Sequence, residues 1–143
     1  MPAYDNNVKT AVQIHDISAE TVHNSDAVTI GRLGLVSGLV ATVHVTEVTA
    51  QAVGAVTFDV EVTTDGGTTW RNAGSVSVPV GKVQALNYIS VPFGFNEIFP
   101  ANFAAANIQI RCSSNIASTV ASADDFSWQA YFGPHQGAPG PYN

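Results

Sequence analysis

One short stretch of the chain places a carboxylate, hydroxyl groups, two glycines and an indole at fixed spacing, in the sequence VEVTTDGGTTW. The residues concerned are Thr63, Asp65, Gly66, Gly67, Thr69 and Trp70. Such a pattern invites an enzymatic interpretation. It also has a local explanation, because adjacent glycines permit positive φ and a short carboxylate accepts hydrogen bonds from turn amides. We therefore expect a structural hairpin, with Trp70 packed back over it.

This spacing resembles the Asp box, the hairpin signature that repeats in sialidase propellers. The resemblance implies a turn more than an activity, because a sialidase of that type needs an arginine cluster, a tyrosine nucleophile and several blades. The chain has 143 residues and one copy of the pattern, too few for a propeller of four-stranded blades. Its three arginines, Arg32, Arg71 and Arg111, fall on separate predicted strands. We expect no enzyme and no catalytic residue.

The histidines do not form a metal-binding pattern. They are His15, His23, His44 and His135. None has a histidine or cysteine partner at zinc-ligand spacing, so no metal is expected. Within its predicted strand, His44 alternates with valines, which places it on the polar face with Thr42 and Thr46.

The remaining reactive groups also have structural explanations. Cys112 is the only cysteine and follows Ile108 and Ile110 at alternate positions, which predicts a buried strand position. Asp124 and Asp125 are adjacent, and neighbouring side chains on a strand point to opposite faces; a solvated loop is the simpler expectation. No phosphate-binding loop or dinucleotide fingerprint is present, so no cofactor is predicted.

The composition predicts an all-β protein. Hydrophobic residues make up 45% of the chain, and Val, Ala and Thr dominate, a bias that suits pleated, half-buried surfaces. The clearest strand alternates Val56, Phe58, Val60 and Val62 with Thr57, Asp59, Glu61 and Thr63. We predict about eight strands in an antiparallel sandwich or jelly roll. The predicted strand segments are 8–17, 27–36, 38–50, 55–64, 68–80, 82–94, 106–114 and 125–133, with a turn over 19–27 and one helical turn within 99–107.

The domain prediction has three parts: an N-terminal arm over 1–7, a sandwich over 8–133 and a Gly/Pro-rich C-terminal arm over 134–143. Segments of this composition fray unless something holds them, so we expect neighbouring subunits to hold both ends, for example by strand addition. The candidate interface residues of the arms are Tyr4, Pro134, His135, Pro139, Pro141 and Tyr142.

The charge balance limits the partners. The net charge is −6 and charged residues are 11% of the chain, against about 25% in an average soluble domain. Without a basic cluster, nucleic acid is not an expected partner. The sequence has neither a secretion signal nor a long apolar run, so we expect synthesis in the cytoplasm and no membrane partner.

A lysine-poor sandwich rich in Thr, Ala and Val, with one cysteine, resembles the decoration or cement proteins of tailed bacteriophages. The resemblance extends over the whole chain but rests on composition, length and strand pattern. It implies a virion protein, assembled in the host cytoplasm, that sits on the capsid outer surface as a dimer or trimer. It also implies the major capsid protein as partner, whose subunits it bridges.

The alternative is a carbohydrate-binding or adhesin module, for example on a phage head fibre or tail. Exposed aromatic side chains would then stack on sugar rings. The candidates are Trp70, Tyr88, Trp128 and Tyr131. The exposure of Trp70 and Trp128 distinguishes the two interpretations, because buried tryptophans cannot form such a platform.

Overall fold

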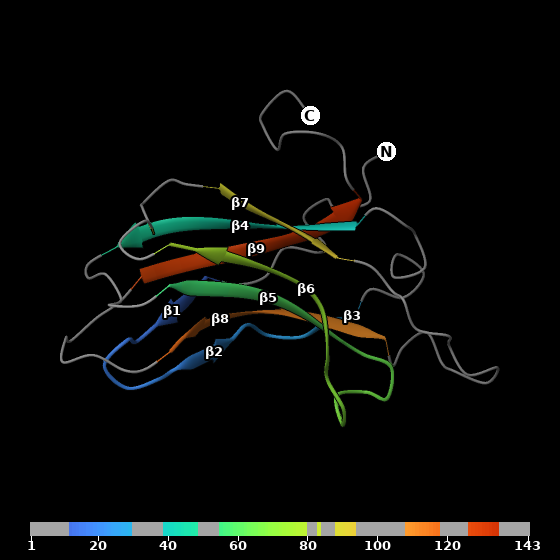
Figure 1. Cartoon of the computed structure of the whole chain (residues 1–143). Helices are drawn as coiled ribbons and strands as arrows, with labels where there is room; N and C mark the ends of the chain where they lie inside the picture. Colours follow the sequence, from blue (N-terminus) through green and yellow to red (C-terminus); the bar gives the residue numbers. More distant parts are fainter. Residues whose placement is uncertain are drawn as a thin grey trace.

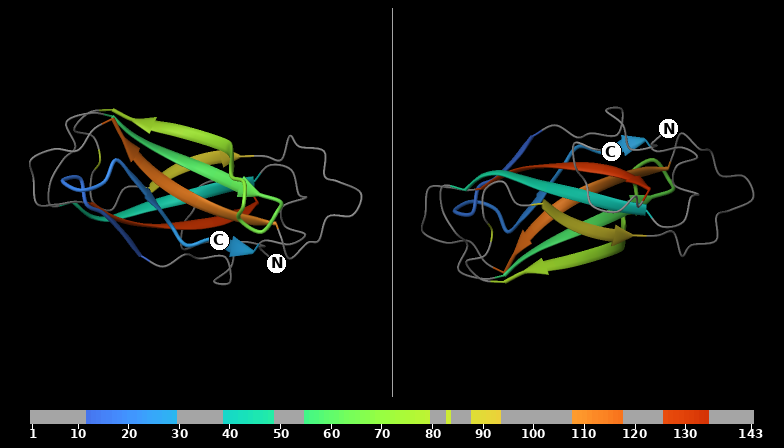
Figure 2. Two further views of the ribbon diagram at one scale, coloured as in Figure 1. Left: turned by 90° about the horizontal axis from the view of Figure 1, so that it is seen from below. Right: turned by 90° about the horizontal axis from the view of Figure 1, so that it is seen from above.

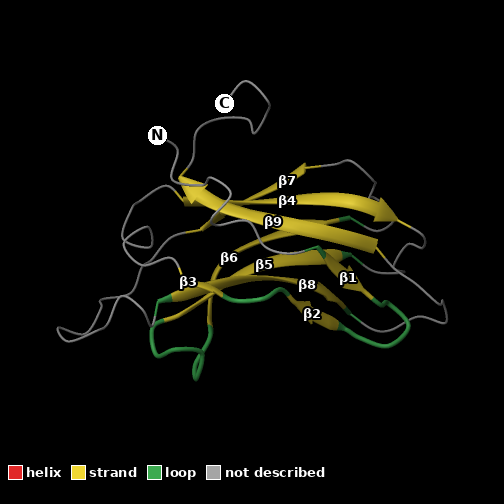
Figure 3. Ribbon diagram, turned by 180° about the vertical axis from the view of Figure 1, so that it is seen from behind, coloured by secondary structure: helices red, strands yellow, loops and turns green. Residues whose placement is uncertain are grey.

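The computed structural model describes residues 12–29, 39–48, 55–79, 83, 88–93, 108–117 and 126–134. In these ranges the chain forms strands and no helix (Figures 1 and 3). The strands are β1 (Gln13–His15), β2 (Val22–Asn24), β3 (Val28–Thr29), β4 (Leu39–Val48), β5 (Val56–Thr63), β6 (Arg71–Val78), β7 (Tyr88–Phe93), β8 (Gln109–Ile116) and β9 (Phe126–Pro134). The predicted all-β class is confirmed. The predicted helical turn lies outside the described residues.

Two antiparallel sheets pack face to face: Figure 1 shows them as two layers, and the views from below and above in Figure 2 show the strands of one lying over those of the other. One has the order β1-β9-β4-β7 and is called here the β4 sheet; the other has the order β2-β8-β5-β6, with β3 beside β8, and is called the β5 sheet. Counted along the chain without β3, these orders become 1-8-3-6 and 2-7-4-5. This is the strand order of a jelly roll.

The core lies between the sheets and follows from the alternation of side chains. Val56, Phe58, Val60 and Val62 of β5 are buried, as predicted. Across from them, β9 contributes large aromatic side chains: Phe58 meets Trp128 edge to face, with ring centroids 5.9 Å apart. Burying side chains of this size supplies most of the favourable free energy of folding.

Cys112 also belongs to this core. It is fully buried on β8, next to β5, with which it pairs at Val60. Burial raises the pKa of the thiol well above its ordinary value, so the side chain stays a protonated, unreactive thiol. The predicted buried strand position is confirmed.

The edge strands β6 and β7 of the two sheets approach each other closely at Gly74. A Cβ atom at this position would overlap the backbone carbonyl oxygen of Pro92. A bulge accompanies the approach, because Val60 pairs with Gly74 while Glu61 pairs with Asn72. Only a glycine lets the two backbones approach this closely.

Three sequence expectations need correction. The predicted turn over 19–27 contains strand β2, which forms because Val22–Asn24 pairs with β8. Thr63, expected on the polar face, is buried because its hydroxyl bonds within the hairpin turn. Pro134, assigned to the C-terminal arm, is the last residue of β9 and pairs with Leu39. β9 therefore extends one residue past the predicted end of the sandwich, because its pairing with β4 continues to Leu39.

Candidate binding face

The Asp-box residues form the hairpin turn between β5 and β6. Gly66 and Gly67 have φ values of 74° and 102°, a region that favours glycine. The Thr63 hydroxyl donates to Asp65 Oδ1 at 2.7 Å and accepts from the Gly67 amide at 3.0 Å. Asp65 Oδ1 also accepts from the Thr69 amide at 2.9 Å. All of these bonds close within the turn, so the motif builds a turn and presents no reacting group.

The same bonds set the acidity of the turn carboxylate. The Thr63 hydroxyl, followed by the Thr69 amide, lowers the pKa of Asp65 to about 2. The charged form is therefore favoured in the folded protein, and its contribution to stability is present above the ordinary carboxyl pKa. That contribution is lost as the pH falls from about 4 toward 2.

Trp70, at the end of the turn, is held against the β5 sheet. The Arg111 guanidinium lies over its ring, 4.1 Å from the centroid, and Arg111 Nε is 2.9 Å from Glu61 Oε1. A cation–π contact and an ion pair thus share one arginine. With Arg111 covering its ring, this half-buried tryptophan is a structural anchor of the hairpin.

Farther along the outer face of the β5 sheet, polar side chains bond to one another. Asp59 Oδ1 accepts from Asn72 Nδ2 at 3.1 Å and also from the Ser75 hydroxyl. Thr57 and Ser77 lie beside each other across the β5–β6 pair, with oxygens 3.5 Å apart. This face therefore carries charges and polar groups that already have protein partners.

The outer face of the β4 sheet is different in chemistry. Its strand residues alternate with the buried Ala41, Val43 and Val45, and the register sets them side by side. We define the aromatic face by Ile14 of β1, Thr42 and His44 of β4, Tyr88 and Ser90 of β7, and Gln129 and Tyr131 of β9. Within the four strands of this sheet, Glu47 is the only carboxylate and no lysine or arginine occurs.

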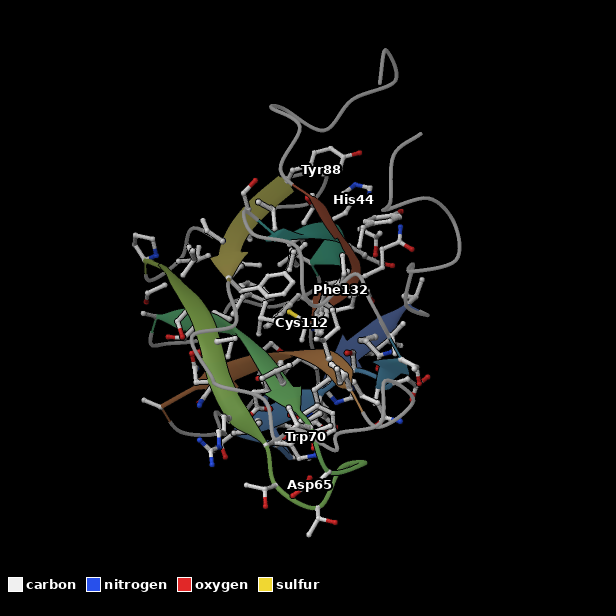
Figure 4. The ribbon with its side chains drawn as sticks, turned by 90° about the vertical axis from the view of Figure 1, so that its right-hand side faces the viewer. His44, Asp65, Trp70, Tyr88, Cys112 and Phe132 are labelled. Atoms are coloured by element: carbon white, nitrogen blue, oxygen red, sulfur yellow. The ribbon has the colours of Figure 1, made fainter. Side chains whose placement is uncertain are left out.

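Tyr88 and His44 form the centre of the aromatic face. Their rings stack with centroids 4.4 Å apart and planes 11° apart, yet Tyr88 keeps 56% of its surface exposed. Tyr131 lies close by: partial burial, and then the neighbouring Tyr88, raise its pKa. Ile14, at the β1 side, is also 56% exposed. Figure 4 shows His44 and Tyr88 together at one side of the molecule, opposite Asp65 and Trp70.

The tryptophan platform considered from the sequence does not form. Trp128 is 0% exposed and donates from its indole nitrogen to Ser114 Oγ at 3.2 Å. The strand register turns it inward, because it pairs with Val45 of the core. With Arg111 over Trp70 as well, Tyr88 is the exposed ring among the four candidates. His44 does lie on the outer face, as predicted.

Several sequence candidates fall outside the described residues. These are Tyr4, Asp124, Asp125, His135, Pro139, Pro141 and Tyr142. Within the described ranges, no group of three or more His, Cys, Asp or Glu side chains is arranged to hold a metal ion. Over the same part of the chain, no helix is long and apolar enough to cross a membrane.

Comparisons with known proteins identify neither a family nor a function for this chain. No protein-family model and no curated protein matches the chain. One solved structure aligns with it: the CBM22-1-GH10 modules of the N-terminal endo-1,4-β-D-xylanase 10B of Clostridium thermocellum, complexed with xylohexaose, at 13% identity and a TM-score of 0.43. The alignment covers 91% of this chain and 26% of that one, so the chain spans about a quarter of its length. Likeness at this level carries no argument about ligand or activity.

Proposed function

We propose that this chain is a non-enzymatic structural protein that attaches to the outer surface of a bacteriophage capsid and stabilises it. The aromatic face is the attachment surface and the major capsid protein is the partner. One observation carries the proposal: Tyr88 and Ile14 are exposed on a sheet face whose four strands contain a single carboxylate. The jelly-roll architecture and the charge-poor composition agree with it.

The chemistry of this face suits a protein interface. Cores of such interfaces are enriched in tyrosine and depleted of charge, because an ion loses its hydration when the partner covers it. Thr42, Ser90 and Gln129 would supply the polar rim around Tyr88. The opposite face has its charges paired within the chain, as Arg111 with Glu61, and is suited to remain in water.

Stabilisation would come from many small contributions. A subunit that buries about 1,000 Å² or more of joint surface gains a few kcal/mol after the entropy of association is subtracted. Multiplied over many copies on one shell, this raises the free energy needed to open the particle. Self-association into a dimer or trimer, and attachment through the terminal arms, are further parts of the proposal.

Reconstitution tests the proposal. Phage capsids that lack this protein are mixed with the purified chain at micromolar concentration, and bound protein is measured by co-sedimentation. The proposal expects saturable binding and a higher melting temperature of the particle. Absence of binding at this concentration, or binding without any change in particle stability, contradicts it.

A second function, carbohydrate binding, is favoured by one observation. The Tyr88 ring stacks on His44 through one face and is more than half exposed, as a sugar-stacking residue would be. Gln129 pairs with His44 from the other side of β4, and Ser90, which pairs with Thr42, follows Tyr88 by two residues on the same strand. Glycan-array binding that is lost in Tyr88→Ala, without any attachment to capsids, would select this function over the first.

A further inference from the structure

A polar junction links the two sheets inside the core. His15 belongs to β1 of the β4 sheet, and its Nδ1 lies 2.6 Å from the hydroxyl oxygen of Ser114, on β8 of the β5 sheet. Trp128 donates to the same oxygen at 3.2 Å. All three side chains are fully buried. A buried histidine between two sheets is unusual, and it must satisfy both ring nitrogens without water.

The partners of His15 assign its protons. Nε2 lies 3.0 Å from the backbone carbonyl oxygen of Glu20, which only accepts, so Nε2 carries the hydrogen. The indole of Trp128 only donates, so the Ser114 oxygen accepts from it and gives its own proton to Nδ1. Every donor and acceptor is then matched for a neutral ring. A second proton, on Nδ1, would turn the Ser114 oxygen into an acceptor from both rings, and its own hydrogen would have to find another acceptor in the core.

The surroundings of His15 oppose a charge. Phe126 of β9 stacks on the ring at 5.2 Å between centroids. The charged or titratable groups nearby come from the β1–β2 turn and β2. They are Asp16, Glu20 and His23, with ring centroids of His15 and His23 6.2 Å apart. From β5, the apolar Phe58 packs edge to face against Phe126 and Trp128. The pKa of His15 is lowered, chiefly by burial; Glu20 and Asp16 only partly offset this, and His23 adds to it.

The strands that the junction holds are short. β1 has three residues, which pair with β9, and β2 has three, which pair with β8. By contrast, β4, β5, β8 and β9 each have eight or more residues. Short edge elements open at lower free energy than the body of a sandwich. Within residues 13–24, the buried side chains are His15 and, two residues further on, Ile17.

We propose that the His15–Ser114–Trp128 junction is an acid-sensitive latch: protonation of His15 releases β1 and β2 while the long strands of both sheets stay folded. In the closed state the His15 ring is neutral. In the open state it takes up a proton at the ordinary histidine pKa of about 6.5. Closure is therefore complete above that pH and weakens as the pH falls below it. In this range the opening equilibrium increases by up to about tenfold per pH unit.

His23, the other histidine of this segment, has partners of its own. Its Nδ1 lies 2.8 Å from Glu20 Oε2, and its Nε2 lies 3.0 Å from Gln13 Oε1. Loss of β1 in acid is therefore assigned to His15 by substituting His15 alone.

Native-state hydrogen exchange of the full chain at pH 7.5 and pH 5.0 tests the latch, after correction for the intrinsic pH dependence of exchange. The expected result is a loss of protection of about tenfold or more in residues 13–24 at pH 5.0, with β5 and β8 unchanged. His15→Gln keeps a donor toward Glu20 but does not titrate, so its residues 13–24 should exchange equally at both values. The matched control His44→Gln, on the outer face, should keep the wild-type difference.

Other outcomes overturn the proposal. Unchanged protection of β1 at pH 5.0, equal loss of protection in every strand, or a pH effect that persists in His15→Gln each contradicts a local latch. If His15→Gln does not fold, NMR titration of His15 in the wild-type chain decides. The proposal is contradicted if the ring is protonated at its ordinary pKa while the β1–β9 pairing stays intact. It is supported if protonation is coupled to loss of that pairing.

Discussion

The two outer faces of this sandwich differ in how their side chains are satisfied. On the β5 sheet, Asp59 bonds to Asn72 and Ser75, and Arg111 bonds to Glu61 while it covers Trp70. On the β4 sheet, apart from the Glu47 carboxylate and the Gln129 amide, the outward groups are rings, hydroxyls and aliphatic side chains around the stacked His44 and Tyr88. Both faces belong to one fold with one core, so the fold does not explain the difference.

The difference indicates which of the two faces a partner can cover at the lower cost in desolvation free energy. A partner that covered the β5 sheet would remove water from its ion pair and its carboxylates. The free-energy cost of desolvating such charges often exceeds the Coulombic gain of their pairing. Covering the β4 sheet removes mostly apolar and aromatic surface from water. The comparison thus directs attention to the β4 sheet, even though the most recognisable sequence motif belongs to the other.

The largest expected effect on stability concerns Gly74, where the edge strands β6 and β7 of the two sheets adjoin. Gly74→Ala places a methyl group against the Pro92 carbonyl, so the edge strands must separate. We expect a decrease of about 3 kcal/mol in the free energy of unfolding, measured by urea denaturation. A decrease below about 0.5 kcal/mol would show that the two sheets are not joined tightly at this edge.

A smaller effect is expected at the hairpin. Thr63→Val keeps the shape of the side chain but removes the hydroxyl that bonds Asp65 and the Gly67 amide. The expected loss is about 1–2 kcal/mol in the free energy of unfolding. Thr57→Val, on the outer face of the same strand, is the matched control and should change stability by less than about 0.5 kcal/mol.

The contacts of Arg111 with Glu61 and Trp70 should contribute less to the free energy of unfolding than the Thr63 hydroxyl does. Arg111→Leu removes the contacts with Glu61 and Trp70, which are partly exposed, and we expect a loss of about 1 kcal/mol. A double-mutant cycle with Glu61→Gln measures the ion-pair part, which should shrink in 1 M salt. Equal loss at low and high salt would show that packing, not charge, holds this arginine.

The smallest effect on stability is expected on the aromatic face. Tyr88→Ser removes one cross-strand ring pair with His44 and should cost about 0.5 kcal/mol. The same variant should lose most of its attachment to capsids, because Tyr88 is a central exposed ring. If Tyr88→Ser instead destabilises the chain by several kcal/mol, the tyrosine is a structural residue and the two faces are not distinguished by function.

Alternation and turn chemistry were enough to predict much of this molecule. The buried row Val56 to Val62, the outward His44 and the buried Cys112 follow from period-two patterns within single strands. The turn at Gly66 and Gly67 follows from local chemistry. Such features depend on neighbours in sequence, which one strand already contains.

Features that depend on pairing between distant segments could not be predicted. The contact between His15 and Ser114 joins residues 99 positions apart, and the His44–Tyr88 stack requires the register of β4 against β7. Trp128 was a candidate for exposure because the sequence does not fix which face of β9 meets the core. The jelly-roll order decides each of these, and only a structure supplies it.

The central claim, that the β4 sheet is the attachment surface, is tested most directly by one matched pair of charges. Ser90→Glu on β7 and Ser77→Glu on β6 each add a carboxylate to an exposed serine of an edge strand, one on each sheet. Binding of both variants to capsids lacking the protein is measured by co-sedimentation. The account predicts that Ser90→Glu weakens attachment about tenfold or more and that Ser77→Glu leaves it within twofold. Equal binding of both variants, or a greater loss in Ser77→Glu, would contradict it.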